Sequence, residues 1–279
     1  MKKVYKVFLM LTIIVAMFYV PCAVSAKENM IPNYEVKLLL NSETVLNSEN
    51  ELNEEYKDFF SAASNYQNVS VAYVDTPDKA FNAAGWTNRI RIKENAKKFE
   101  LAYKKRYEIV DYDMDAALSA TNKEGFDVSD DNYEAQIDWG YNNMTLSITR
   151  KKDVTNKGYG NLELPNTSDT IEILKDKMPN KENNWLYENW GTALIETGKK
   201  YGDVYCKKYS GVLNDIEVDI EIWELVKSNK TEYITELSFK EDTYAAAERN
   251  RNKITSLLDE KGVLLHKDAL KTQTILNMY

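Results

Sequence analysis

Alternation of apolar and polar residues dominates this chain and predicts more strand than helix. Nine segments alternate with a period of two residues, as strands that bury one face do. They cover residues 33–40, 69–75, 86–94, 98–107, 133–140, 144–151, 204–210, 216–226 and 233–240. Short polar turns at 94–97 and 142–143 predict hairpins, so we expect mostly antiparallel pairing.

Helical periodicity is confined to the segments between and after these strands. It predicts helices over residues 49–63, 170–177, 183–197 and 245–258, and a last amphipathic piece at 267–278. The order of elements therefore indicates an α+β fold. No linker rich in Pro, Gly or Ser and no repeat divides residues 27–279, which indicates a single domain there.

The polar faces of the strands carry charges of selected sign. From Ile216 to Ile222, for example, one face is fully apolar and the other fully acidic. A single strand of this kind indicates only a buried and a solvated face of an ordinary sheet. Repetition in six strands favours a closed barrel with charged faces inward and helices packed outside on the apolar faces. The rows are Asn33/Glu35/Lys37, Arg89/Arg91/Lys93, Glu100/Lys104/Arg106, Glu134/Gln136/Asp138, Glu217/Asp219/Glu221 and Glu236/Ser238/Lys240.

The N-terminus has the layout of a cleavable secretory signal. Three lysines lead into an apolar run from Val7 to Val20, and Ala23-Val-Ser-Ala26 follows. We therefore expect removal of residues 1–26 and a secreted or extracytoplasmic protein, which would touch the membrane only if the leader is retained. Without the leader Cys206 is the single thiol, so no internal disulfide is possible.

Charge limits the classes of partner. The formal net charge is −8, and loss of the three leader lysines makes it −11, from 33 basic and 44 acidic residues. Such an acidic chain argues against nucleic acid, because binding to a phosphate backbone normally shows as a basic surface. If the protein binds a polyanion, its positive charge must gather in one place.

One region carries the strongest functional signal. The turn Tyr73-Val-Asp-Thr-Pro-Asp78 precedes a strand in which Arg89, Arg91 and Lys93 leave one face. Together with Asn33-Tyr-Glu-Val-Lys37 in the first strand, these motifs resemble the CYTH family of triphosphate tunnel enzymes. The resemblance implies a closed antiparallel β-barrel of about eight or nine strands, which forms a tunnel for a triphosphate and has its helices outside.

The resemblance also implies a role for individual residues. Phosphate oxygens would be bound by the basic side chains Lys37, Arg89, Arg91, Lys104, Arg106 and Lys240. A divalent cation, Mg²⁺ or Mn²⁺, would be held by Glu35, Glu221 and Glu236, and the catalytic acids that orient water would be Glu35, Glu236 and Asp219. The alternative for Lys104 and Arg106 is a solvated hairpin edge.

Two departures from the family pattern leave the function open. Asn33 stands where the family has the first Glu of its opening motif, and Ser238 where it has the second Glu of its closing strand. Both changes remove negative charge from the expected metal site. The chain is expected to bind and hydrolyse a linear triphosphate or polyphosphate. The alternatives are a non-catalytic exported polyanion-binding protein with a degenerate metal site, and a structural domain whose charged faces are solvated.

Overall fold

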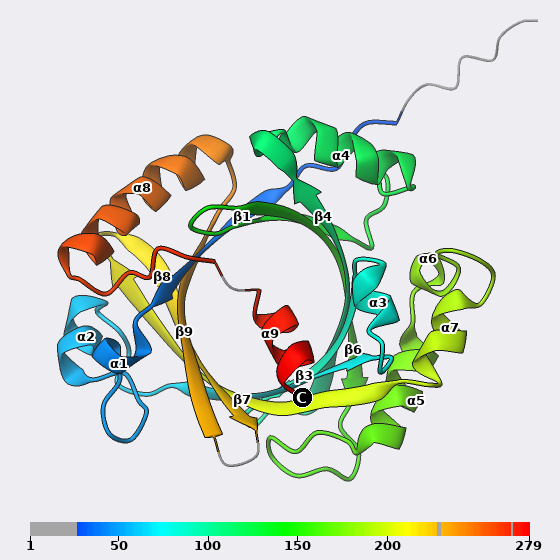
Figure 1. Ribbon diagram of the computed structural model, residues 1–279, viewed down its shortest axis with the longest axis horizontal. Helices are drawn as coiled ribbons and strands as arrows, with labels where there is room; N and C mark the ends of the chain where they lie inside the picture. The colour runs from blue at the N-terminus through cyan, green and yellow to red at the C-terminus, as the bar shows by residue number, and fades with distance from the viewer. Residues whose placement is uncertain (1–26, 228–229, 269) are drawn as a thin grey trace, which may run out of the picture.

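The computed structural model describes residues 27–227, 230–268 and 270–279, whose centre is a closed β-barrel (Figure 1). Its strands are Asn33–Leu40 (β1), Gln67–Asp75 (β2), Trp86–Lys93 (β3), Lys98–Ile109 (β4), Glu134–Trp139 (β5), Met144–Thr155 (β6), Lys199–Leu213 (β7), Ile216–Lys227 (β8) and Lys230–Glu241 (β9). The order around the barrel is β1-β5-β6-β4-β3-β2-β7-β8-β9, and β9 pairs with β1 to close it. The predicted barrel is confirmed, although β1 and β5 pair in parallel. The predicted leader lies outside the described residues.

The helices are short except for α8. They span Ser42–Val45 (α1), Glu54–Phe59 (α2), Ala80–Ala83 (α3), Met114–Lys123 (α4), Thr167–Lys177 (α5), Asn180–Asn183 (α6), Trp190–Ile195 (α7), Tyr244–Glu260 (α8) and Lys271–Met278 (α9), with a 3-10 turn at Val110–Tyr112. The predictions for 49–63 and 183–197 were too long. The side chain of Asn53 caps α2 by accepting the Tyr56 N–H at 3.1 Å, and Asn189 separates α6 from α7 in a left-handed conformation. The helices α1, α3 and α4 were not predicted from the sequence.

The main core lies outside the barrel wall, between the strands and the surrounding helices. Outward side chains such as Val36, Leu38 and Ile220 are fully buried or nearly so, and Ile254 and Leu258 of α8 belong to the same apolar cluster. Burial of these apolar faces drives the helices onto the wall and leaves the other face of each strand for the interior. Within the described residues, the helices are all too short or too polar to cross a bilayer.

One helix contradicts the prediction that all helices pack outside. Figure 1 shows α9 inside the ring of strands. Its residues Ile275 and Leu276 are buried in a second apolar cluster with Val71 of β2, Val204 of β7 and Trp223 of β8. This side of the interior is apolar, and the packing of α9 on it removes apolar surface from water.

Candidate anion-binding tunnel

The inward faces of the strands and the start of α9 enclose a cavity of about 230 Å³. Eight basic side chains line it: Lys37, Arg89, Arg91, Lys93, Lys104, Arg106, Lys208 and Lys271. Four carboxylates accompany them: Glu35, Asp138, Glu221 and Glu236. The acidic chain therefore concentrates an excess of positive charge in its interior, as binding of a polyanion requires.

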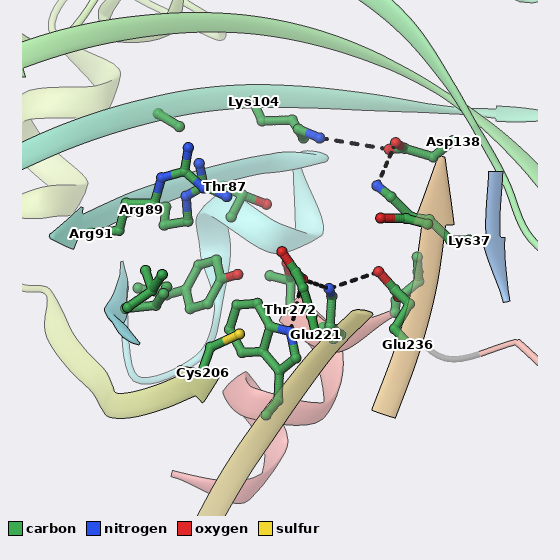
Figure 2. Close-up of a pocket in the computed structure, with 18 of the residues that line it drawn as sticks. Lys37, Thr87, Arg89, Arg91, Lys104, Asp138, Cys206, Glu221, Glu236 and Thr272 are labelled. Carbon is green, nitrogen blue, oxygen red and sulfur yellow. Dashed lines mark hydrogen bonds and ion pairs between the residues drawn. The ribbon is translucent and has the colours of Figure 1, made fainter. Parts of the chain in front are cut away.

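The paired arginines of β3 point into this cavity (Figure 2). Arg89 and Arg91 each direct Nη2 at Glu100 of β4, at 2.9 and 2.7 Å, because Arg91 lies opposite Glu100 in the strand register. Although burial opposes ionisation of Glu100, the two arginines hold its pKa below the ordinary value. One carboxylate neutralises only one of two guanidinium groups, and both Nε atoms are buried without a hydrogen-bond partner. The pair thus retains charge and unused donors.

A second cluster joins β1, β4 and β5, and Figure 2 shows its Lys37 and Asp138 across the cavity from the arginines. Lys37 Nζ lies 2.7 Å from Glu35 and 2.7 Å from Asp138, and Lys104 Nζ lies 3.6 Å from Asp138. Burial opposes the charge on Asp138, but Lys104, Lys37 and Arg106 hold its pKa well below the usual range. Burial lowers the pKa of Lys104 to about 7, with help from Arg106 and Lys37. Lys104 is therefore a buried amine, and an anion bound nearby would favour its protonated form.

A third cluster contains two acids on neighbouring strands. Glu221 of β8 lies opposite Glu236 of β9, and Lys271 of α9 places Nζ 2.6 Å from the first and 2.8 Å from the second. Glu221 also accepts a hydrogen bond from Trp223 Nε1 at 2.9 Å. Burial opposes ionisation of Glu221, but Lys271 lowers its pKa to about 2, whereas burial raises the pKa of Glu236.

The structure brings most of the predicted site residues together. The cavity is lined by Lys37, Arg89, Arg91, Lys104, Arg106, Glu35, Glu221 and Glu236. Asp219 and Lys240 line a neighbouring cavity of about 650 Å³, and Asp219 pairs at 2.7 Å with Lys208, which lines the central cavity. Glu35 and Ser238 line both cavities, and Lys208 of the central cavity is the partner of Asp219, so the two cavities adjoin.

Sequence reasoning missed some members of the cavity. Asp138 belongs to one of the charged rows but was assigned no role, and Lys208 was not among the predicted site residues. Lys271 was not predicted as a site residue, because it belongs to a segment expected outside the barrel. Its position follows from the apolar contacts of α9, and no motif in the sequence encodes those contacts.

The three predicted metal ligands do not fit a divalent cation as they are arranged. Glu35 pairs with Lys37, whereas Glu221 and Glu236 share Lys271, so the carboxylates belong to two separate ion-pair clusters. Across residues 27–227, 230–268 and 270–279, there is no group of three or more His, Cys, Asp or Glu side chains suited to a metal. The neutral replacements lie on the same strands: Asn33 Oδ1 is buried without a partner, and Ser238 is buried.

The Tyr73–Asp78 motif has a structural role that its sequence alone did not disclose. The carboxylate of Asp75 accepts the backbone N–H groups of Thr76, Phe81 and Asn82 at 2.7 to 2.9 Å. Thr76 Oγ1 accepts the N–H of Ala80 at 2.8 Å. These bonds fold the chain after β2 into α3 and so set the start of the arginine strand.

Two residues of types that often act in catalysis, His266 and Cys206, have ordinary surroundings. His266 is an exposed surface residue, 2.6 Å from Asp259 and stacked on Tyr141. Cys206 is buried in the apolar cluster that packs against α9, and burial raises its pKa well above the usual value. Cys206 thus has the surroundings of a core thiol, and His266 does not line the central cavity.

Comparisons with known proteins place the fold. No protein-family model and no curated protein matches the sequence. A Hippeastrum protein provisionally assigned as an adenylyl cyclase, described as having a dominant triphosphatase activity, superposes with a TM-score of 0.53 at 11% identity over 87% of this chain and 94% of that chain. A provisionally assigned adenylate cyclase of Bacillus halodurans gives a TM-score of 0.47 at 12% identity, over 89% of this chain and 98% of that chain. At these identities the likeness shows the fold.

Proposed function

Because this chain has the tunnel fold of the CYTH-type adenylate cyclases and triphosphatases, we propose that it binds a linear triphosphate or short polyphosphate inside the barrel. The observation that carries the proposal is the charge of the central cavity, where eight basic side chains outnumber the four lining carboxylates even with Glu100 and Asp219, which pair with lining cations, added. A compact, multiply charged anion would offset this excess. A neutral ligand would leave it unbalanced.

The chemistry of the lining favours phosphate among anions. Arginine presents a planar fork of donors that matches phosphate oxygens, and lysine presents a compact point charge. Figure 2 shows Arg89 and Arg91 on one side of the cavity, Lys37 on the other, and Lys104 between them on the strand next to the arginines. Cations on both sides suit a chain of successive phosphate groups better than a single small anion.

Calorimetric titration with tripolyphosphate in EDTA tests this proposal. Arg89→Gln removes one charged contact, worth roughly 1.5–3 kcal/mol, so we expect the dissociation constant to rise about tenfold or more. Arg249→Gln is the matched control, because Arg249 is exposed on α8 outside the barrel. Equal affinities of wild type and Arg89→Gln, or no binding by wild type at millimolar ligand, would reject the tunnel as the binding site.

A second candidate is hydrolysis of a phosphoanhydride bond in the same tunnel. The triphosphatase activity described for the Hippeastrum protein favours it. Cations that surround a phosphoryl group stabilise the charge that develops during its transfer. Release of inorganic phosphate from tripolyphosphate, long-chain polyphosphate, ATP and thiamine triphosphate, with and without Mg²⁺ or Mn²⁺, is the test. Turnover that Arg89→Gln abolishes would establish an enzyme, and binding without turnover would leave the non-catalytic alternative.

A further inference from the structure

Lys271 occupies a site that the strands build for a cation. Glu221 and Glu236 lie directly opposite each other on β8 and β9, where two like charges repel unless a cation lies between them. The ammonium group of Lys271 is within 2.8 Å of both carboxylates and lies 4.5 Å from the centre of the Trp223 ring. The side chains of Lys271 and Glu236 are 17% and 4% exposed.

The helix that carries Lys271 is fixed at several points. Its apolar face packs on the inner wall through Ile275 and Leu276. At its far end, the hydroxyl of Tyr279 accepts the backbone N–H of Val226 of β8 at 2.9 Å. Near its start, Arg106 Nη2 lies 3.4 Å from Thr272 Oγ1. Lys271 is thus held in place by packing and does not depend on its two ion pairs alone.

We infer that Lys271 is the resident cation of the Glu221–Glu236 pair and takes the position that a divalent metal would otherwise occupy beside bound phosphate. An ammonium group has three N–H donors, and the two carboxylates use two of them. The third is available to the cavity that Lys271 lines. The inference deepens the proposed function, since it makes phosphate binding in this tunnel independent of metal.

Removal of the ammonium group should convert the acid pair into a metal site. Carboxylate oxygens are the ligands that Mg²⁺ and Mn²⁺ prefer, and in Lys271→Met both would lose their cation while the side chain keeps its approximate length. Titration of the phosphate-free protein with Mn²⁺, followed by electron paramagnetic resonance, measures the change. We expect wild type to show no saturable Mn²⁺ site in the tunnel. Lys271→Met should gain such a site and bind Mn²⁺ there with an affinity higher than that of wild type by about tenfold or more. The added change Glu236→Gln should abolish this gain.

A surface lysine supplies the matched control. Lys261 pairs with Glu55 at 2.6 Å on the outside of the barrel, so Lys261→Met should leave Mn²⁺ binding as in wild type. If Lys271→Met does not fold, Lys271→Gln is used in its place, because glutamine keeps an N–H donor for the acid pair. A folded Lys271 variant that binds Mn²⁺ no better than wild type would overturn the inference. So would a saturable Mn²⁺ site in wild type that Glu236→Gln removes, a measurement that needs no Lys271 variant.

The phosphate measurement separates this inference from the proposed function. Wild type should bind tripolyphosphate in EDTA, without added Mn²⁺, and Lys271→Met should bind it more weakly in EDTA. Absence of tripolyphosphate binding would reject the proposed function while the Mn²⁺ titration still decides the role of Lys271. Binding of tripolyphosphate that requires added Mn²⁺ in wild type would overturn the inference alone.

Discussion

At the scale of single residues, Glu182 of α6 is a carboxyl buried outside the tunnel. It is fully buried, and neither carboxyl oxygen has a hydrogen-bond partner. Burial raises its pKa to about 8 from an ordinary value of 4.5. Between these two pH values the unfolded chain ionises Glu182 while the folded chain keeps the proton, so stability falls as pH rises through this window.

Glu182→Gln should remove this pH dependence. The pKa difference corresponds to at most about 5 kcal/mol of unfolding free energy, which wild type loses by pH 8. We expect the variant to be more stable than wild type by about 2–5 kcal/mol at pH 8 and similar to it at pH 4.5. Urea unfolding across this range measures the effect. Glu172→Gln, an exposed change on α5, is the control, and parallel pH profiles for wild type and Glu182→Gln would contradict the prediction.

Lys104 should couple phosphate binding to a proton. Burial lowers its pKa to about 7, and a bound anion favours the charged form. Wild type should therefore take up a proton when it binds tripolyphosphate at pH 8, and its affinity should fall by up to about tenfold per pH unit above 7. Calorimetry in two buffers of different ionisation enthalpy gives the uptake. Because the ligand itself titrates, the decisive quantity is the difference from Lys104→Met, and no difference would contradict the role of Lys104.

At the scale of elements, the turn after β2 shows how a sequence motif can serve folding. Asp75 satisfies three backbone N–H groups that lead into α3, and its carboxylate is buried. Because these groups have no other partner in the turn, Asp75→Ala should lower the unfolding free energy by about 2–4 kcal/mol, and Asp75→Asn should lower it less. Chemical unfolding measures the loss. The folded fraction of Asp75→Ala should bind tripolyphosphate normally, and loss of binding without loss of stability would assign Asp75 to the site.

At the scale of the whole molecule, bound phosphate should stabilise the barrel by offsetting its interior charge. At a ligand concentration of about 100 times the dissociation constant, mass action adds about 2.7 kcal/mol, or roughly 5–10 °C in melting temperature for a chain of this size. The increase should shrink from 50 to 500 mM NaCl because salt screens the attraction. Thermal unfolding of wild type and of Arg89→Gln/Arg91→Gln measures it. A shift of equal size in both proteins, or one that salt leaves unchanged, would contradict electrostatic binding in the tunnel.

The sequence by itself determined the strands and the side of each strand that faces the interior. Period-two patterning settles this, because a strand that exposes Arg89 and Arg91 on one face must expose Ile90 on the other. The boundaries of helices were predicted less closely, because a single N-cap residue such as Asn53 or the left-handed Asn189 sets where α2 and α7 begin. The nine strands and eight of the central site residues were therefore predictable from local pattern and motif.

Only the tertiary structure decided which charges neutralise each other. Glu100 meets both arginines because β3 pairs with β4, and Asp138 meets Lys37 because β1 pairs with β5. The position of α9 was likewise beyond local pattern, since an amphipathic helix packs equally well on any apolar surface and the surface inside the barrel exists only after closure. Lys271 therefore lies in the site although no local pattern in the sequence predicted it there.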